Sequence, residues 1–379
     1  MGLLTGALPD FPWDTLVPYA DKARAHPGGI VDLSVGTPVD PTPAVVRDAL
    51  AAAADSPGYP TTHGTAELRE AVVRWFARRR GVPGLDPADV LPTVGSKELV
   101  ALLPSLLGLG AGDVVLHPSA AYPTYDVGAR LAGATPEPTS DPAGRLRDGA
   151  GDVRLVWLNS PGNPTGEVLG VEELRAVLEA ARAAAARDGR PVVVASDECY
   201  AELPWDEPWA SDGVPSLLDP RVTQGDRTGT LAVYSLSKQS NLAGYRAAFV
   251  AGDPLLVRAL LEARKHMGLI VPGPVQAATV AALDDDAHVD AQRERYRRRR
   301  AVLRSALEDA GYAVDGSAAG LYLWTRAAGQ DAWTTVADLA GLGILVAPGT
   351  FYGAPEHVRV ALTAPDDAIA EAAARLQGA

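Results

Sequence analysis

The sequence predicts an α/β protein in which a mostly parallel sheet with helices on both faces forms a large domain and a smaller α+β domain follows. Two patterns support this fold class. Short apolar, β-branched runs alternate with helical patterns through the middle of the chain, and from residue 286 one long helical stretch precedes several short strands. The 379 residues also suit two lobes, because single cores stop growing near roughly 250–300 residues.

Five runs in the middle of the chain are typical of buried strands. Helical patterns lie between them, such as 171–189, and this alternation predicts parallel neighbours. The gap between the last two runs is too short for a helical crossover, so the fifth is expected to pair antiparallel. The runs are DVVLH (113–117), VRLVWL (153–158), PVVVAS (191–196), TLAVYS (230–235) and RAAFVA (246–251).

The two ends of the chain have different patterns. Residues 286–312 predict one long helix, and LYLWTR, GILVA and EHVRVAL predict short strands before a last helix. Residues 1–60 are rich in Pro and Gly, and we expect them to be too irregular for a core and to wrap between lobes. The expected division is an N-terminal arm with part of the small domain (1–40), a large domain (41–285) and a C-terminal small domain (286–379).

Composition and charge narrow the function. Hydrophobic residues make up 47% and charged residues 21%, which is ordinary for a soluble globular protein. The net charge of -13 argues against a nucleic-acid or anionic-membrane surface, and no apolar run is long enough to span a bilayer. A single cysteine, Cys199, precludes an intrachain disulfide and favours the reducing cytoplasm. The histidines show no metal-ligand spacing.

Lys238 stands directly after a predicted buried strand, in YSLSKQSNLAGYR. Its amine is therefore expected at the carboxyl edge of the sheet, where ligands bind in such folds. Taken alone, a surface lysine is the commoner explanation. The alternative is a desolvated amine that loses its proton and forms an imine with an aldehyde.

Asp197 ends the preceding predicted strand, in PVVVASDECY. A carboxylate in such a place needs a partner. It either caps the next segment or holds the protonated ring nitrogen of pyridoxal phosphate. An acid for the ring nitrogen and a lysine for the aldehyde are the paired requirements of that cofactor.

Two further groups of residues suit a phosphate. Gly95, Ser96 and Lys97 form a turn that opens a helix, and the free N–H groups of a helix start bind phosphate, although Ser96 is equally suited to be an ordinary N-cap. An arginine near Lys238 can clamp a phosphate with two hydrogen bonds, whereas the alternative is a surface ion pair. The side chains around Lys238 are Ser235, Ser237 and Arg246.

Two more residues follow strands at the same edge. Asn163, in LNSPGNPTG, can donate to a ring hydroxyl oxygen or simply form the turn. Tyr122, in AAYPTYD, can stack on a flat ring or pack in the core.

In this order, the motifs resemble the fold-type I pyridoxal phosphate aminotransferases of the aspartate aminotransferase superfamily, class I and II. The motifs are VGSKE, NSPGNPTG, SDECY, SLSK with an arginine eight residues after the lysine, and HVRVAL, and with SVGTP they span about residues 34–363. The resemblance implies an aspartate aminotransferase-like fold with a seven-stranded sheet, pyridoxal 5'-phosphate as cofactor, small-molecule amino and oxo acid substrates, and a homodimer.

The resemblance also implies a role for each residue. Lys238 would bind the cofactor covalently and Asp197 its ring nitrogen, while Tyr200 and Asn163 would contact the ring hydroxyl and Tyr122 would stack on the ring. The phosphate would be held by Gly95, Ser96, Lys97, Ser235, Ser237 and Arg246.

Three other residues would complete the site. Tyr59, in GYPTTHG, would reach the neighbouring subunit's phosphate, so that the homodimer shares its active sites. Arg359 would bind the substrate's α-carboxylate, with Gly36 as a nearby backbone contact.

Longer phrases resemble the succinyldiaminopimelate transaminases of lysine and cell-wall precursor synthesis. These include VDLSVGTPVDPTP, AYPTYDVGARLAG and ILVAPGTFYG. This resemblance implies amino transfer from glutamate to N-succinyl-2-amino-6-oxopimelate, giving N-succinyl-LL-2,6-diaminopimelate. Aminotransferases for aspartate, alanine or LL-diaminopimelate and pyridoxal phosphate C–S lyases remain alternatives.

Recognition of the distal, succinylated end stays open. Aspartate-specific relatives use a second arginine, and no residue here is assigned to that role. Arg264, Lys265 and His266 are candidates, although a solvated helix end is the commoner explanation for such a cluster.

Overall fold

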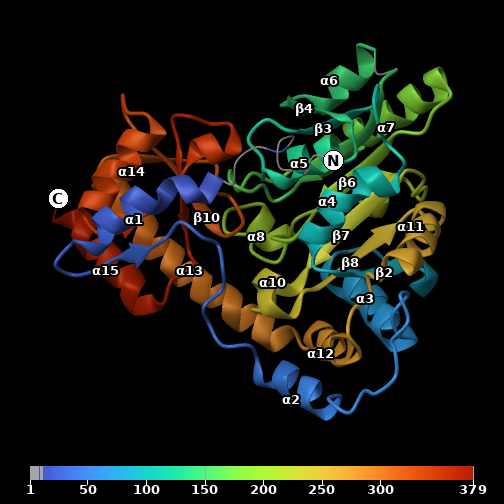
Figure 1. Cartoon of the computed structure of the whole chain (residues 1–379), viewed down its shortest axis with the longest axis horizontal. Coiled ribbons are helices and arrows are strands. Elements are labelled where there is room, and N and C mark those ends of the chain that lie inside the picture. The colour runs from blue at the N-terminus through green and yellow to red at the C-terminus, as the bar shows by residue number, and fades with distance from the viewer. Residues whose placement is uncertain (1–7, 9–11, 150, 379) are drawn as a thin grey trace, which may run out of the picture.

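The structure is a computed structural model that describes residue 8 and residues 12–149 and 151–378. A seven-stranded sheet forms the centre of the large domain (Figure 1). Six of its strands run in one direction, and β8 alone runs against them because it pairs antiparallel with both β7 and β2. In spatial order the strands are β2 (Val90–Val94), β8 (Ala247–Gly252), β7 (Thr230–Ser235), β6 (Val193–Asp197), β5 (Val153–Asn159), β3 (Val114–Pro118) and β4 (Thr135–Thr139).

The predicted α/β fold and the antiparallel return of the fifth run are confirmed. Strands β2 and β4 did not stand out in the sequence. Their sequences, VLPTV and TPEPT, contain proline, which a sheet tolerates mainly at its edges, and both strands are edge strands.

Helices cover both faces of the sheet, and the alternating side chains of the buried strands pack against them. Along β6, Val193 and Ala195 join a cluster with Leu99 of α4, whereas Val194 joins the cluster with Leu178 of α7. The helices of this domain are α2 (Ala44–Ala52), α3 (Ala66–Arg79), α4 (Ser96–Leu106), α5 (Thr124–Leu131), α6 (Pro142–Arg147), α7 (Val171–Asp188), α8 (Trp209–Asp212), α9 (Pro220–Thr223), α10 (Leu236–Gln239), α11 (Pro254–Met267) and α12 (Gly273–Asp284).

The smaller domain contains an antiparallel sheet, a two-stranded parallel pair and four helices within the described ranges. Its long helix α13 (Asp286–Asp309) confirms the helix predicted from residue 286 and runs from the large domain into the small one (Figure 1). The other elements are β9 (Tyr312–Asp315), β10 (Tyr322–Ala327), β12 (Ala347–Pro348) and β13 (Val358–Ala361) in the sheet, β1 (Val31–Asp32) with β11 (Ile344–Leu345), and α1 (Val17–Arg24), α14 (Ala332–Gly341) and α15 (Asp366–Gln377).

Residues 1–60 are more regular than we predicted. Helix α2 packs against α12 and buries Val46 completely, while α1 packs against α14. The prediction of an irregular segment was wrong here because one buried valine on a short helix leaves little hydrophobic periodicity to detect. Residues 1–7 and 9–11 of the predicted arm lie outside the described residues.

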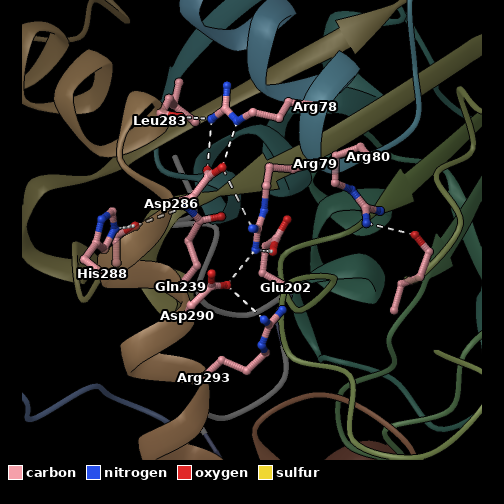
Figure 2. Close-up of polar contacts among 12 residues, drawn as sticks. Arg78, Arg79, Arg80, Glu202, Gln239, Leu283, Asp286, His288, Asp290 and Arg293 are labelled. Atoms are coloured by element: carbon pink, nitrogen blue, oxygen red, sulfur yellow. Dashed lines mark hydrogen bonds and ion pairs between the residues drawn. The ribbon is translucent and has the colours of Figure 1, made fainter. Parts of the chain in front are cut away.

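Three consecutive arginines at the end of α3 fasten other elements to the large domain (Figure 2). Arg78 pairs with Asp286 at 2.9 Å, at the start of α13. Arg79 pairs with Glu202 at 2.6 Å and with Asp290 of α13 at 3.2 Å. The buried Arg80 pairs at 3.0 Å with Glu198, the residue after Asp197, so this ion pair holds the start of the loop that follows β6.

Candidate active site

A cavity of about 880 Å³ opens at the carboxyl edge of the large sheet and reaches the small domain. Most of the predicted site residues line it together, although they come from distant parts of the chain. They are Gly36, Ser96, Lys97, Tyr122, Asn163, Asp197, Tyr200, Ser235, Ser237, Lys238, Arg246 and Arg359. Of the other two, Gly95 lies directly against Arg246, and Tyr59 does not line this cavity.

Lys238 lies on the short helix α10, immediately after β7. Its Nζ donates to the Gly36 carbonyl at 2.5 Å, and burial lowers the pKa of the amine. Its partner is this backbone carbonyl, and no ion pair with a carboxylate is found for it among the described residues. A lysine that is desolvated and lacks a counter-ion is easier to deprotonate, which a nucleophilic amine requires.

Asp197 ends β6 and is buried. One carboxylate oxygen accepts from the Tyr125 hydroxyl at 3.1 Å, and the other accepts from the Cys199 backbone N–H at 3.2 Å. Burial raises the pKa of Asp197, and these hydrogen bonds offset only part of that effect. The carboxylate has no arginine or lysine partner in the described chain, so its chemistry suits a cationic ring nitrogen.

The start of α4 and the loop after β7 form an anion-binding corner. Gly95 precedes α4 with a φ of 79°, and no side chain caps the helix start. A Cβ on Gly95 would lie 2.0 Å from Nη2 of Arg246, so only glycine allows this approach. The Ser235 and Ser237 hydroxyls lie 2.8 Å apart on the other side of the loop. Free helix N–H groups, hydroxyls and a guanidinium suit a phosphate.

Arg359 on β13 is buried without an acidic partner among the described residues. Its Nη1 donates to Asn163 Oδ1 at 2.9 Å and its Nη2 donates to the Ser34 carbonyl at 2.7 Å, while Nε has no partner. The Tyr322 ring lies 4.0 Å from the guanidinium carbon. These neutral partners fix the guanidinium and leave its charge available to a carboxylate ligand.

Two tyrosine hydroxyls meet beside Lys238. The Tyr200 and Tyr322 hydroxyls are 3.2 Å apart, and burial raises the pKa of Tyr200 well above its ordinary value. Burial also opposes ionisation of Tyr322, but the charges of Arg359 and Lys238 together hold its pKa below the ordinary value. Tyr122 also lines the cavity, and its ring centroid lies 5.6 Å from Nζ of Lys97.

Sequence reasoning missed Tyr322 and Tyr125. Tyr125 is fully buried between Asp197 and Trp157, and Tyr322 belongs to a strand of the other domain. Only the packing of the two domains brings Tyr322 to Lys238, so its own sequence context, LYLWTR, gave no signal beyond a strand.

The residues considered for the distal end of the substrate do not line the cavity. Arg264 is completely buried and pairs with Glu98 at 2.6 Å, so the expected solvated helix end is wrong for this residue. Lys265 pairs with Glu262 on the surface. Lys97 on α4 lines the cavity and has no ion pair among the described residues, as does Arg246, which lies directly against Gly95 in the anion-binding corner.

Comparison with known proteins decides the family. Residues 29–376 match the model of the family described as aminotransferase class I and II. The chain belongs to this family. The members depend on pyridoxal phosphate and act on small amino and oxo acids, so the cofactor and the general reaction predicted from the sequence are confirmed.

Individual relatives cover nearly the whole aminotransferase. The chain is 56% identical to the 4-dedimethylamino-4-oxo-anhydrotetracycline transaminase OxyQ of Streptomyces rimosus, over 97% of this chain and 99% of that protein. It is 57% identical to the probable aminotransferase Rv1178 of Mycobacterium tuberculosis, over 99% of this chain and 87% of that protein.

Solved structures confirm the aspartate aminotransferase-like fold. A Thermus thermophilus aspartate aminotransferase mutant superposes with a TM-score of 0.85 at 25% identity, covering 100% of this chain and 99% of that one. A probable N-succinyldiaminopimelate aminotransferase, also of Thermus thermophilus, gives a TM-score of 0.83 at 29% identity, covering 97% of this chain and all of that one.

Three groups that line the cavity or adjoin it lack partners of the kind that pyridoxal phosphate would supply. The Asp197 carboxylate lacks a cation, the α4 start lacks a cap, and the Lys238 amine lacks a counter-ion in the part of the chain that is described. No cluster of three or more His, Cys, Asp or Glu within these ranges could hold a metal ion. No described helix combines the length and apolar character that a membrane crossing requires.

Proposed function

We propose that this aminotransferase moves the amino group of glutamate to N-succinyl-2-amino-6-oxopimelate and so forms N-succinyl-LL-2,6-diaminopimelate. One observation carries the choice of a substrate with carboxylates at both ends. Four cations without acidic partners among the described residues line the cavity; Lys238 and Arg246 belong to the reacting amine and the anion-binding corner, which leaves Arg359 on β13 and Lys97 on α4. The likeness to the Thermus protein named for this substrate class supports the same choice.

The residues would divide the work as follows. Asp197 would hold the ring nitrogen, Asn163 and Tyr200 the ring hydroxyl, and the corner of Gly95, Ser96 and Arg246 the phosphate. When bound, the cofactor supplies an electron sink for the carbanion that forms at the substrate's Cα. Asp197 favours that role because a carboxylate keeps the ring nitrogen protonated.

Proton transfer would belong to Lys238. Its Nζ lies at the Gly36 carbonyl, and its lowered pKa allows the neutral amine that can take a proton from Cα. Arg359 would hold the α-carboxylate of both glutamate and the oxo acid, so that Cα faces the same amine in both half-reactions. In this proposal Lys97 would bind the distal carboxylate of the longer acceptor instead of the cofactor phosphate, which is the role that the family resemblance implied for it.

We also propose a cytoplasmic homodimer. Tyr59 is fully exposed and does not line the cavity of its own chain. A large aromatic side chain in that position is suited to a neighbouring subunit, where it would contact the cofactor phosphate of the partner's site.

A second candidate follows from the relative OxyQ, whose name describes amination of a tetracyclic ketone. The 880 Å³ cavity has an apolar wall that includes Trp13, Val100 and Val127, which is compatible with a ring system. This candidate gives Lys97 no carboxylate to bind.

An acceptor panel with glutamate as donor separates the candidates. It contains the succinylated oxopimelate, short oxo acids and 4-dedimethylamino-4-oxo-anhydrotetracycline. We expect the succinylated acid to have the highest kcat/KM, and Lys97→Gln to lower that value by about tenfold or more, the worth of one charge-assisted hydrogen bond.

The matched control is Lys265→Gln, a surface lysine outside the cavity, which should leave the acceptor preference unchanged. Equal kinetic parameters for succinylated and short oxo acids would refute the proposed acceptor. Release of ammonia from a thioether amino acid without any acceptor would instead identify a lyase.

A further inference from the structure

One face of α13 carries a stripe of polar side chains. His288, Gln292, Tyr296 and Arg299 recur at helical spacing, so they point to the same side. Gln292, Tyr296 and Arg299 are buried, and little of the His288 side chain is exposed. We refer to these four residues as the α13 stripe. It begins beside α10, the helix that bears Lys238, and leads into the small domain (Figure 1).

At its first end the stripe holds the residues that follow Lys238. The His288 ring lies 2.8 Å from the Ser240 hydroxyl through Nε2 and 3.0 Å from Asp285 through Nδ1. Ser240 Oγ also accepts from Gln239 Nε2 at 3.1 Å, and Gln239 Oε1 accepts from the Tyr234 hydroxyl at 2.6 Å. Ser240, Gln239 and Tyr234 are buried.

These hydrogen bonds form one connected network. With a neutral His288 ring that donates Nδ1–H to Asp285, Ser240 donates to Nε2, Gln239 donates to Ser240 and Tyr234 donates to Gln239. Buried networks connected in this way hold their members rigidly. The peptide on both sides of Lys238 is therefore fixed through side chains that never enter the cavity.

Farther along, the stripe holds the segment that contacts the Lys238 amine. Gln292 Oε1 accepts from Asn241 at 3.0 Å, and its Nε2 donates to Asp40 at 2.8 Å. Arg299 donates to both oxygens of Asp40 at 2.7 and 2.8 Å. Asp40 lies four residues after Gly36, whose carbonyl accepts from Lys238 Nζ.

We propose that the α13 stripe is a positioning element for Lys238. It fixes the lysine backbone through Ser240 and Asn241, and it fixes the partner of the amine through Asp40. His288 and Gln292 are positioning residues, because they act on the reacting amine only through these neighbours. The inference rests on the proposed role of Lys238.

The stripe is not required merely to attach α13 to the large domain. Asp286 and Asp290 of the same helix already pair with Arg78 and Arg79 of α3 (Figure 2). Those ion pairs end on α3, whereas the bonds of the stripe end on the loop after Lys238. The α3 contacts therefore provide a control that loosens the same helix without touching the lysine segment.

The test compares His288→Leu, Ser240→Ala and the double variant with the control Arg78→Gln. Three quantities are measured on the holoenzyme: kcat and KM for the glutamate half-reaction, and the rate of backbone hydrogen exchange in residues 236–242. We expect His288→Leu to lower kcat by about tenfold with KM changed less than about twofold, because a misplaced reacting group slows chemistry more than binding. Exchange at residues 236–242 should accelerate.

The double variant guards against a trivial loss of folding. It removes both members of the His288–Ser240 pair, so neither is left facing an empty partner, although Gln239 loses one acceptor. The double variant should therefore still fold, as thermal melting beside the control checks, yet stay slow. His288→Gln, which can still donate and accept, should restore most of kcat.

Recovery of kcat in the double variant, or exchange rates that match those of Arg78→Gln, would overturn the inference. Lys238→Ala tests the proposed role of the lysine separately. If that variant keeps turnover, the proposed function fails, whereas the exchange measurement still reports whether the stripe holds the segment.

Discussion

Replacing Arg359 by glutamine should remove most of the affinity for α-carboxylates while leaving the fold intact. The guanidinium has five N–H donors, and the protein uses two of them, for Asn163 and Ser34. The remaining donors can form two charge-assisted hydrogen bonds to a carboxylate, each worth about 1.5–3 kcal/mol. Their loss amounts to about 3–6 kcal/mol, or about 10² to 10⁴ in kcat/KM.

The assay is the half-reaction with glutamate, followed by the absorbance of the bound cofactor, with thermal melting measured in parallel. Arg359→Gln takes away a buried charge that has no acid, so the melting temperature should change little. Arg264→Gln is the matched control. It strands Glu98, which should cost about 3 kcal/mol or less because Glu98 is partly exposed, and it should leave glutamate binding unchanged.

A loss below about tenfold in kcat/KM for Arg359→Gln would refute this reasoning, since even one charge-assisted hydrogen bond is worth more. So would an equal loss in a correctly folded Arg264→Gln variant.

Three further outcomes follow from the site. Cofactor affinity should fall as the pH drops through the raised pKa of Asp197 in the cofactor-free protein, because the protonated carboxyl must then lose its proton on binding. Titration calorimetry at several pH values measures this affinity, and an affinity that does not change with pH would contradict the prediction. Gly95→Ala should weaken cofactor binding by about 10- to 100-fold, since the new Cβ displaces Arg246, and equilibrium dialysis would show an unchanged affinity if the contact is unimportant. In Tyr322→Phe the alkaline fall of kcat/KM for glutamate should move to higher pH. The lowered pKa of Tyr322 lets its phenolate form in the wild type, where it competes with the substrate carboxylate for Arg359. An alkaline fall at the same pH in the variant would argue against that competition.

The sequence predicts the fold well wherever strands are buried on both faces. The run TLAVYS coincides with β7, because a strand that is buried on both faces is apolar along most of its length. The edge strands β2 and β4 escaped prediction because each contains proline, and the helix α2 because only Val46 on it is buried.

Part of the candidate site could also be predicted from the sequence, and part could not. Lys238, Asp197 and Asn163 stand at strand ends, so the sheet topology alone brings them together at one edge. Tyr322 and the α13 stripe were not predicted, because their partners lie on the other side of a domain boundary. Arg264 was misjudged, since its burial is set by Glu98 on a distant helix.

The antiparallel return from β7 to β8 has a consequence for protein engineering. Residues 235–246 form a single connection between two hydrogen-bonded neighbours, and it carries the amine, both serines and the arginine of the anion-binding corner. These groups can be transplanted or lost only as one block, and an insertion anywhere within it would change the spacing of all of them. A circular permutation should therefore open the exposed turn at residues 224–228, ahead of β7, where no cavity-lining side chain is found among the described residues.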